Sequence, residues 1–292
     1  MTAGQRLKQT ISERRALLVP GAANALAARV IEDQGFEAVY LTGAGLANTG
    51  LGVPDIGLVT LTELARATEA IAGATALPLI VDADTGFGNA VNVAHTVRIL
   101  ERAGAAAIQL EDQSFPKRCG HFAGKELIPA AEMVGKIEAA VAARGSADCL
   151  IIARTDARAV EGLETAISRA EAYARAGADV TFVEAPESPA ELAEIPRRLG
   201  VPQVANMVVG GKTPLATQTE LAAMGFGLVL YANAALQASV LAMQEVLGAL
   251  RRDGSLAAVS NRLASFAERQ RLVGKPDWDT LEARFATPPE RR

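Results

Sequence analysis

The pattern that decides the fold is clearest in residues 77–112, LPLIVDADTGFGNAVNVAHTVRILERAGAAAIQLED. An apolar run at Leu77–Val81 is followed by a polar turn, a segment with helical spacing at Val91–Ala103, and a second apolar run at Ala106–Leu110. Short runs that are apolar throughout indicate strands buried on both faces, as in a parallel sheet covered by helices. The segment therefore predicts a strand–helix–strand unit.

The same unit recurs along the whole chain. The expected strands are Ala16–Val19, Ala38–Leu41, Leu77–Val81, Ala106–Leu110, Leu150–Ala153, Val180–Val183, Gln203–Ala205 and Leu228–Tyr231. The expected helices between them include Leu61–Ile71, Val91–Ala103, Ala131–Ala143, Gly162–Ala176 and Pro189–Leu199. Eight such units favour an α/β fold of the (β/α)8 TIM-barrel type over an open doubly wound sheet. No Gly-x-Gly-x-x-Gly follows the first strand, which argues against a dinucleotide-binding fold.

The pattern also predicts how the chain is divided. Residues 1–234 are expected to form the barrel with the active site, and residues 235–286 a helical extension. Helices are expected there at Ala235–Arg251 and Ala257–Gln270, separated by Gly254. The extension, with the chain's one tryptophan, is as well suited to packing on a neighbouring subunit as on its own barrel. We expect residues 287–292 to be a disordered tail.

Composition narrows the classes of function. Half of the 292 residues are hydrophobic, the net charge is −4, and no block of lysine and arginine occurs, so nucleic acid is not an expected partner. No run of about 18 apolar residues and no signal segment is seen, which predicts a cytoplasmic protein that has no membrane partner. The two cysteines, Cys119 and Cys149, fit a reducing compartment.

Polar residues follow the predicted strands, where a barrel of this type places its active site. A single polar residue there is usually a helix cap or a turn. Charged residues after four consecutive strands are harder to explain as caps, so we expect them to converge on one site. These strand-end residues are Thr42, Gly43, Ala44, Gly45, Asp82, Asp84, Glu111, Asp112, Arg154, Thr155, Asp156, Glu184, Asn206 and Asn233.

Three of the strand-end residues are acids on neighbouring strands, namely Asp82, Asp84 and Glu111. Clustered carboxylates repel one another unless a cation neutralises them. Oxygen ligands without histidine suit Mg²⁺ or Mn²⁺, whereas the two histidines, His95 and His121, are too few and too dispersed for a zinc site. The neighbouring Asp112 is better explained by a salt bridge or a loop hydrogen bond.

The run Lys117-Arg118-Cys119-Gly120-His121 is a second concentration of reactive side chains. A thiol beside two cations and an imidazole is expected to have a lowered pKa. Gly120 and the nearby Gly124 suggest a loop that can close over a site. Cys149 precedes an apolar strand, and there we expect a cysteine that only fills space.

Five motifs together resemble the isocitrate lyase and phosphoenolpyruvate mutase superfamily over Val19–Tyr231. They are VDADTGFGN (81–89), LEDQ (110–113), KRCGH (117–121), ARTDA (153–157) and ANMVVGGKTP (205–214). The resemblance points to the branch of methylisocitrate lyases, 2,3-dimethylmalate lyases and carboxyphosphonoenolpyruvate phosphonomutases. It implies a barrel, and a homotetramer built as a dimer of dimers that exchange a C-terminal helix.

The resemblance also implies a role for each matching residue. Asp82 and Asp84 would lie at Mg²⁺, with Asp55 and Glu111 holding metal-bound waters and Glu111 contributing to catalysis. Backbone amides of Thr42, Gly43 and Ala44 would bind a carboxylate or oxo group, and Arg154 would hold a carboxylate and polarise an oxygen. Gly120, His121, Glu184 and Asn206 would contact the substrate, and Cys119 would protonate the departing carbanion.

The implied activity is a Mg²⁺-dependent carbon–carbon lyase that converts a 2-hydroxy di- or tricarboxylate to pyruvate or a related oxo acid. Phe122 and Val208 stand where methylisocitrate lyases carry polar residues, and Thr42 stands where many lyases have serine. These departures favour a 2-alkylmalate over methylisocitrate. A carboxyphosphonoenolpyruvate phosphonomutase and an oxaloacetate hydrolase or decarboxylase stay open as alternatives, and a catalytically silent barrel is disfavoured.

Overall fold

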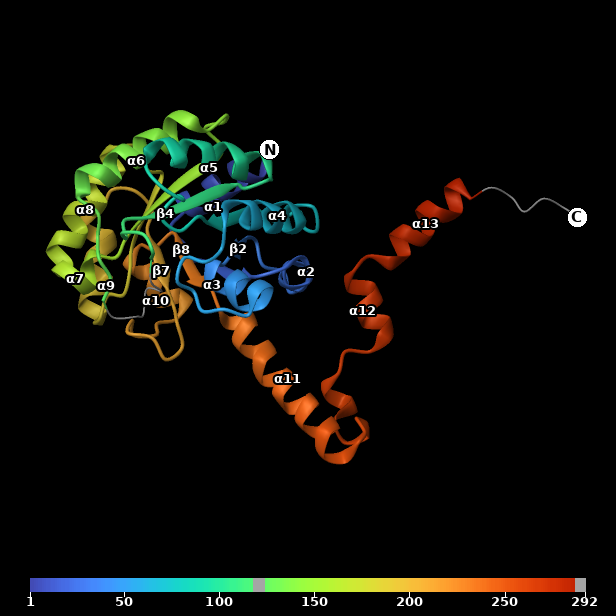
Figure 1. The fold of residues 1–292 in the computed structure, drawn as a ribbon. Coiled ribbons are helices and arrows are strands. Elements are labelled where there is room, and N and C mark those ends of the chain that lie inside the picture. The colour runs from blue at the N-terminus through green and yellow to red at the C-terminus, as the bar shows by residue number, and fades with distance from the viewer. Residues whose placement is uncertain (118–123, 287–292) are drawn as a thin grey trace, which may run out of the picture. The chain divides into compact units, whose positions relative to one another are not determined.

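The computed structural model describes residues 1–117 and 124–286. Eight parallel strands with helices around them form a barrel (Figure 1). The strands are β1 (Leu17–Ala22), β2 (Val39–Leu41), β3 (Leu79–Asp82), β4 (Ala107–Glu111), β5 (Leu150–Thr155), β6 (Val180–Val183), β7 (Val204–Asn206) and β8 (Leu228–Tyr231). All eight predicted strands are confirmed, with ends that shift by at most three residues.

The strands follow the order β6-β5-β4-β3-β2-β1-β8-β7, so β1 and β8 pair and β6 and β7 stand at the ends of the series. The two end strands meet in one isolated bridge, Thr181 to Gln203, where the Thr181 hydroxyl donates to Gln203 Oε1 at 2.9 Å. This contact nearly closes the barrel. The boundary between β6 and β7, called the seam below, is joined by this single bridge.

Helices connect the strands and cover the outside of the barrel (Figure 1). The helices of the first half are α1 (Ala3–Ser12), α2 (Ala25–Asp33), α3 (Gly43–Leu46), a π-helical turn (Ala47–Leu51), α4 (Leu61–Ala72), α5 (Ala90–Arg102) and α6 (Ala130–Ala143). Those of the second half are α7 (Ala157–Glu161), α8 (Leu163–Arg175), α9 (Pro189–Arg198) and α10 (Gln218–Met224).

Local sequence signals set the ends of these helices. Thr60 caps α4 and Thr217 caps α10, and each hydroxyl is paired with a glutamate three residues later in a capping box. After α5 the chain turns at Gly104, whose φ of 105° is a conformation that favours glycine. The turn leads straight into β4.

Apolar side chains of the barrel form two layers. Inside the barrel, Val19, Tyr40, Ile80 and other inward-facing residues form one cluster with Leu7 of α1. Outside it, residues such as Leu41 pack against the surrounding helices. Each fully buried aliphatic side chain contributes about 1.5–3 kcal/mol relative to exposure. The strand-end loops are thus built on a rigid scaffold.

The chain divides into two compact units, Met1–Leu236 and a second that begins at Gln237. The helices from β8 onward are α11 (Ala234–Asp253), a 3-10 helix (Ala257–Arg262), α12 (Phe266–Leu272) and α13 (Lys275–Phe285). The prediction of a single helix over residues 257–270 is therefore wrong in part. Leu263 has extended dihedral angles, and Ser265 accepts a hydrogen bond from the Glu268 amide and so starts a new helix. The tail predicted at residues 287–292 lies outside the described residues.

Helices long and apolar enough to span a membrane are absent from the part of the chain that the structure describes.

Candidate active site

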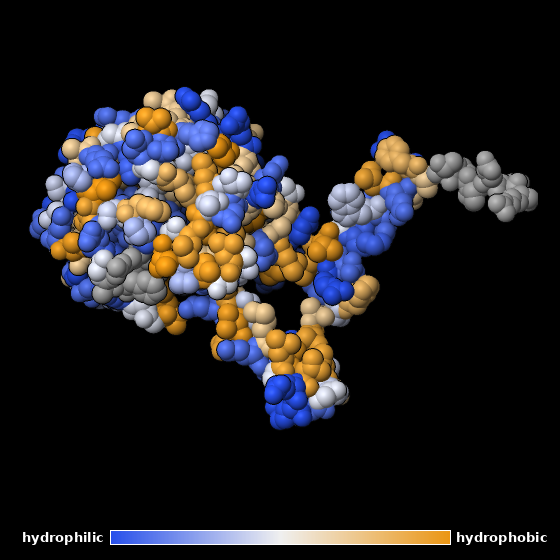
Figure 2. Space-filling view, in the orientation of Figure 1, coloured by the Kyte–Doolittle hydropathy of each residue, from blue (hydrophilic) through white to orange (hydrophobic). Residues whose placement is uncertain are grey.

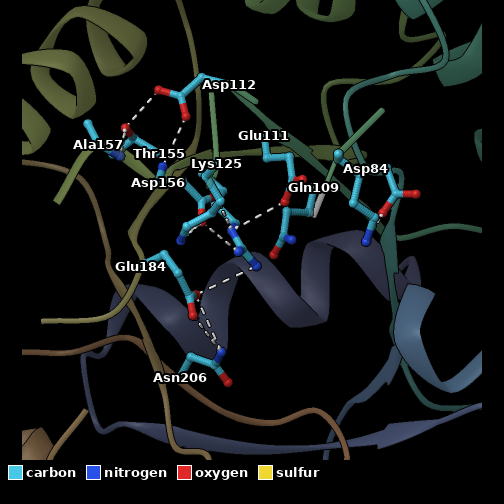
Figure 3. Close-up of polar contacts among 12 residues, drawn as sticks. Asp84, Gln109, Glu111, Asp112, Lys125, Thr155, Asp156, Ala157, Glu184 and Asn206 are labelled. Carbon is cyan, nitrogen blue, oxygen red and sulfur yellow. Dashed lines mark hydrogen bonds and ion pairs between the residues drawn. The ribbon is translucent and has the colours of Figure 1, made fainter. Parts of the chain in front are cut away.

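A pocket opens at the carboxyl ends of the strands, where the sequence placed the site. Most of its lining consists of strand-end side chains, several of which Figure 3 draws as sticks. The lining residues are Tyr40, Thr42, Ala44, Asp55, Asp82, Glu111, Lys117, Arg154, Glu184, Asn206, Val208, Leu230, Ala232 and Asn233. The predicted convergence of polar residues from different strands is thereby observed.

Asp82 and Asp84 are presented by a tightly wound turn at the end of β3. Asp84 has a φ of 49°, a left-handed conformation that is uncommon outside glycine, and its amide donates to Asp82 Oδ1 at 3.2 Å. Gln109 on β4 donates to the same oxygen at 3.3 Å. A Cβ at Gly43 would lie 3.2 Å from Asp84 Oδ1 and 3.4 Å from Asp82 Oδ2, so only a bare backbone leaves space beside both carboxylates.

Lys117 brings a buried ammonium group into this acidic cluster. Its Nζ lies 2.5 Å from Asp55 Oδ1 and 2.9 Å from Asp84 Oδ1. Burial lowers the pKa of the Lys117 ammonium. The nearby carboxylates of Asp84, Glu111, Asp82 and Asp55 raise that pKa by more than burial lowers it, so the net pKa lies above the usual value for lysine. The lysine is therefore a fixed positive charge among the acids.

The charge of Lys117 does not fully compensate the carboxylates. Burial, and then repulsion from Asp82 and Asp55, raise the pKa of Asp84 to about 7 in spite of Lys117. Burial also raises the pKa of Glu111, against the attraction of Arg154. Among residues 1–117 and 124–286, no group donates a hydrogen bond to Glu111 Oε1, whereas Asp84 Oδ1 has Lys117 Nζ as its partner at 2.9 Å. The cluster thus has capacity for a further cation.

The donor set fits a hydrated divalent ion better than a tightly caged one. Within the described ranges, no three or more His, Cys, Asp and Glu side chains stand close enough to form a ready set of ligands. Mg²⁺ characteristically keeps several waters and takes only one or two carboxylates. Two acids of the β3 turn, together with the open Oε1 of Glu111, agree with that preference.

Arg154, on β5, is held on several sides in the opposite part of the pocket. Its Nε and Nη2 donate to Asp156 at 2.9 and 3.0 Å, and its Nε also lies 3.3 Å from Glu111 Oε2. The guanidinium carbon lies 5.1 Å from the centre of the Phe182 ring. Nη1, the nitrogen that Asp156 does not engage, lies 3.6 Å from Glu184 Oε2.

Amides and hydroxyls complete the polar wall. Asn206 Nδ2 lies 3.4 Å from both carboxylate oxygens of Glu184 across the seam between β6 and β7 (Figure 3). The Thr42 hydroxyl donates to Asn233 Oδ1 at 3.2 Å and accepts from the Gly45 amide. The Thr42 amide donates to Ala22 O at 3.3 Å and so already has a partner within the barrel.

One side of the pocket is apolar. Val208 follows β7, whereas Leu230 and Ala232 lie at the end of β8. Among the described residues that line the pocket, Arg154 is the only arginine, and Lys117 is already paired with two acids. The described lining thus offers one guanidinium with an apolar wall beside it.

Other predictions made from the sequence have mixed outcomes. Asp112 is confirmed as a structural acid, because it accepts hydrogen bonds from Thr155 and Tyr173 and pairs with Arg169. His95 is exposed on α5, and Cys149 is buried with a pKa that burial raises to about 12, so neither belongs to the site. Predictions were also made for Cys119, Gly120, His121 and Phe122, which lie outside the described residues.

Sequence reasoning missed some of the residues that line the pocket. Tyr40 was not singled out, although it lies two positions before Thr42, and in a strand such residues share a face. Lys117 was noted only as a neighbour of the thiol, because its contact with Asp55 joins two loops that are far apart in sequence. The β8 residues Leu230 and Ala232 carried no chemical signal.

Comparisons with known proteins agree with this geometry. A family model described as phosphoenolpyruvate phosphomutase matches residues 7–251. The chain is 44% identical to 2,3-dimethylmalate lyase from Eubacterium barkeri, with 98% of this chain and 99% of the relative covered. It is 46% identical to 2-methylisocitrate lyase from Aeropyrum pernix, with 96% and 90% covered.

Solved structures extend the comparison to three dimensions. A crystal structure of 2,3-dimethylmalate lyase, described as a PEP mutase/isocitrate lyase superfamily member, superimposes with a TM-score of 0.91 at 36% identity over 97% of this chain and 95% of that one. A phosphonopyruvate hydrolase in complex with oxalate and Mg²⁺ superimposes with a TM-score of 0.88 at 36% identity, with 98% and 99% covered.

Proposed function

The chain belongs to the phosphoenolpyruvate phosphomutase family, within the superfamily that its motifs resembled, and on that premise we propose that it is a carbon–carbon lyase for a 2-alkylmalate. The observation that carries the proposal is the pocket itself. An acidic cluster with an open carboxylate oxygen faces a single buried guanidinium, and an apolar wall lies beside them.

A divalent ion, Mg²⁺ or in its place Mn²⁺, is proposed as the cofactor. Asp82 and Asp84 would hold it, with Asp55 and Glu111 acting through bound water. Bound there, the ion would offset the negative charge that develops on the oxo and carboxylate oxygens of the substrate. The raised pKa of Asp84 and the open Oε1 of Glu111 support this assignment. An added cation would favour the charged form of Asp84 and would give Glu111 Oε1 a partner.

The bond that breaks joins C2, which carries the hydroxyl, to C3. We propose that the hydroxyl proton passes to Glu111, whose Oε1 is open in the pocket. The O–H electron pair then forms the oxo group as the C2–C3 bond breaks, and the C2–C3 pair becomes an enolate beside the second carboxylate. Arg154 is placed to bind a substrate carboxylate through Nη1, because Asp156 holds its other two nitrogens. Preorganised donors of this kind lower the barrier without reorganisation during the step.

The reaction ends when the C3 carbanion takes up a proton. We propose Cys119 as the acid, with Gly120 and His121 contributing to substrate binding, on the strength of the KRCGH motif. Glu184 and Asn206 are proposed to contact the substrate, and Gly43 and Ala44 to donate backbone amides to it. Val208, Leu230 and Ala232 would receive the alkyl group, since they form the apolar side of the lining.

A panel of substrates tests the proposal. Purified protein is assayed for release of pyruvate or another oxo acid from 2,3-dimethylmalate, methylisocitrate, oxaloacetate and phosphonopyruvate, each with Mg²⁺ and with excess EDTA. We expect the highest kcat/KM with 2,3-dimethylmalate and loss of activity with EDTA. Preference for methylisocitrate would contradict the assignment of the apolar wall, and full activity in EDTA would contradict the metal.

Chemistry at a carbon–phosphorus bond is the second candidate. It is favoured by the likeness to a phosphonopyruvate hydrolase that covers nearly the whole of both chains. Turnover of phosphonopyruvate in the panel, without cleavage of any malate, would select this candidate over the lyase.

A further inference from the structure

A second buried lysine, Lys125, lies close to the guanidinium of the pocket. It follows the KRCGH motif in sequence, and its Nζ donates to Asp156 Oδ1 at 2.7 Å (Figure 3). Both side chains are almost completely removed from solvent. The mechanism above uses Asp156 only as the partner of Arg154 and gives Lys125 no role.

Asp156 is a shared acceptor for two cations. Its Oδ1 accepts from Lys125 and also from Arg154 Nη2 at 3.0 Å, whereas its Oδ2 accepts from Arg154 Nε at 2.9 Å. A bidentate pair of this kind fixes the plane of a guanidinium as well as its position. Because two of the three nitrogens are held, rotation of Arg154 is blocked and Nη1 is the nitrogen left for a ligand.

Asp156 is itself held in place by a second buried acid, Asp112. Its amide donates to Asp112 Oδ1 at 3.0 Å, and Asp112 Oδ2 accepts from Thr155 and Tyr173, each at 2.7 Å. Asp112 and Asp156 are both fully buried. The carboxylate that orients Arg154 therefore has little freedom to move.

Lys125 also changes the balance of charge around Arg154. Three carboxylates, those of Glu111, Asp156 and Glu184, lie within 3.6 Å of the guanidinium. With Lys125 present, Asp156 is shared between two cations, so more of the positive charge of Arg154 stays available to an anion. Without Lys125, the group around Arg154 would become more negative by one charge.

We propose that Lys125 and Asp156 are positioning residues, which act through Arg154 to set the edge and the effective charge that it presents to a substrate carboxylate. The inference rests on the proposed function only in so far as the ligand is a carboxylate. It concerns the binding of that ligand and leaves the divalent-ion acids untouched.

The test compares the wild type with Lys125→Met and Lys125→Arg. Oxalate serves as a stable dicarboxylate probe, and its dissociation constant is measured by calorimetry with Mg²⁺ present. Loss of one charge-assisted contact corresponds to a weakening of about 10- to 100-fold. We expect K125M to weaken oxalate binding by that factor and to keep the Mg²⁺ affinity within about threefold of the wild-type value. In turnover of the substrate, K125M should raise KM more than it lowers kcat. K125R should restore oxalate binding to within about threefold of the wild type.

A matched control separates positioning from a structural role. Arg144 and Asp179 form an ion pair at 2.6 Å, with Arg144 in the segment before β5 and Asp179 before β6, at the opposite end of the barrel from the pocket. Arg144→Met is expected to lower the melting temperature but to keep the oxalate dissociation constant unchanged. If K125M does not fold, Lys125→Gln replaces it in the same comparison.

The outcomes are distinguishable. Oxalate binding by K125M equal to that of the wild type overturns the positioning role. Equal losses of oxalate and Mg²⁺ affinity together with a lowered melting temperature also overturn it, because they indicate a structural role alone. A wild type that binds Mg²⁺ but no dicarboxylate refutes the proposed function, and the inference fails with it.

Discussion

Two buried cations divide the pocket into halves with different tasks. Lys117 is paired with Asp84 of the β3 turn and with Asp55 of the segment before α4, whereas Arg154 is paired with Asp156. Burial of a charge is costly unless it is paired, so each cation is tied to its acids in the resting protein. The Nη1 side of Arg154, where Glu184 lies at 3.6 Å, and the open oxygen of Glu111 are where a ligand is expected to complete the site.

Replacing Cys119 with serine tests the proposed acid. A hydroxyl is a much weaker acid than a thiol, and a positioned general acid contributes about 10²- to 10⁴-fold to a rate. We expect kcat for carbon–carbon cleavage to fall by a factor in that range, while pyruvate and Mg²⁺ bind nearly as in the wild type. The measurement is steady-state kinetics together with calorimetry.

The chain's other cysteine is the control for that experiment. Cys149 is buried away from the pocket, so Cys149→Ala is expected to retain kcat. Full turnover by C119S would remove the cysteine from the mechanism.

Asp82→Ala tests the metal assignment. Loss of partners that merely support a metal ligand already costs about 10- to 100-fold in affinity, so loss of a direct ligand is expected to cost at least about 100-fold. Mg²⁺ titration by calorimetry measures the change, and Glu138→Ala, at an exposed acid on α6, is the control. Unchanged Mg²⁺ affinity in D82A would place the ion elsewhere.

Residue types and their places after strands were enough to predict most of the polar lining. Asp82, Glu111, Arg154, Glu184 and Asn206 converge because the ends of parallel strands meet at one edge, whatever the details of the loops. The pairing of Lys117 with Asp55, and of Lys125 with Asp156, could not be predicted in the same way. Those contacts depend on how separate loops fold back toward the barrel.

At the scale of elements, Asp112 joins parts of the barrel that are distant in sequence. It directly follows β4 and accepts hydrogen bonds from Thr155 on β5 and Tyr173 on α8, and it also pairs with Arg169 on α8. The pKa of the Asp112 carboxyl is raised by burial, against the hydrogen bonds that favour its charged form. This single side chain links two strands and a helix.

Asp112→Ala is expected to destabilise the barrel strongly. The substitution leaves the Thr155 hydroxyl, the Tyr173 phenol and the Asp156 amide without their acceptor and removes one carboxylate from Arg169. Breaking a buried pair in this way costs about 3–5 kcal/mol. The free energy of unfolding, measured by urea denaturation, should fall by that amount. The exposed pair between Arg198 and Glu164 is the control, since Glu164→Gln should change the free energy of unfolding by less than about 1 kcal/mol. A loss below about 1 kcal/mol in D112A would show that the link is dispensable.

Helices were predicted well where a strand follows, and less well in the C-terminal unit. In the barrel, apolar spacing and capping residues agree, because each helix must bury one face on the sheet. From residue 257 onward the spacing continued through Leu263, but the Ser265 cap divides the segment into two helices. Local capping prevailed there over a weak periodic pattern.

At the scale of the whole molecule, the C-terminal unit exposes large apolar side chains. Figure 2 shows hydrophobic surface on this unit, and the exposed residues include Leu241, Phe266, Trp278 and Phe285. Contiguous exposed apolar surface of this kind marks protein–protein contacts. We propose that the unit packs on a second copy of the chain in a homo-oligomer, in line with the helix exchange that the family resemblance implies.

Trp278→Asp with Phe285→Asp tests that assembly. Placing charges at two exposed aromatic positions of α13 should weaken an apolar contact, because a buried, unpaired carboxylate is strongly unfavourable. We expect the wild type to have the mass of an oligomer in light scattering after size exclusion, and the double variant to shift toward smaller species.

Asp277→Ala, at an exposed polar position of the same helix, should leave the oligomer mass unchanged. A wild type that is monomeric at micromolar concentration would contradict the proposed packing.

The seam between β6 and β7 bears on how the pocket can change over evolution. One bridge joins the two strands, and Glu184 and Asn206 stand at their ends on either side of it. Widening the barrel at this point would disrupt fewer hydrogen bonds than widening it between β4 and β5, where a full ladder pairs the strands. We infer that new substrate tails can be accommodated beside Val208 by small strand movements, with the polar residues at the ends of the other strands kept in place. A barrel with one compliant side can diversify its substrates while it conserves its chemistry.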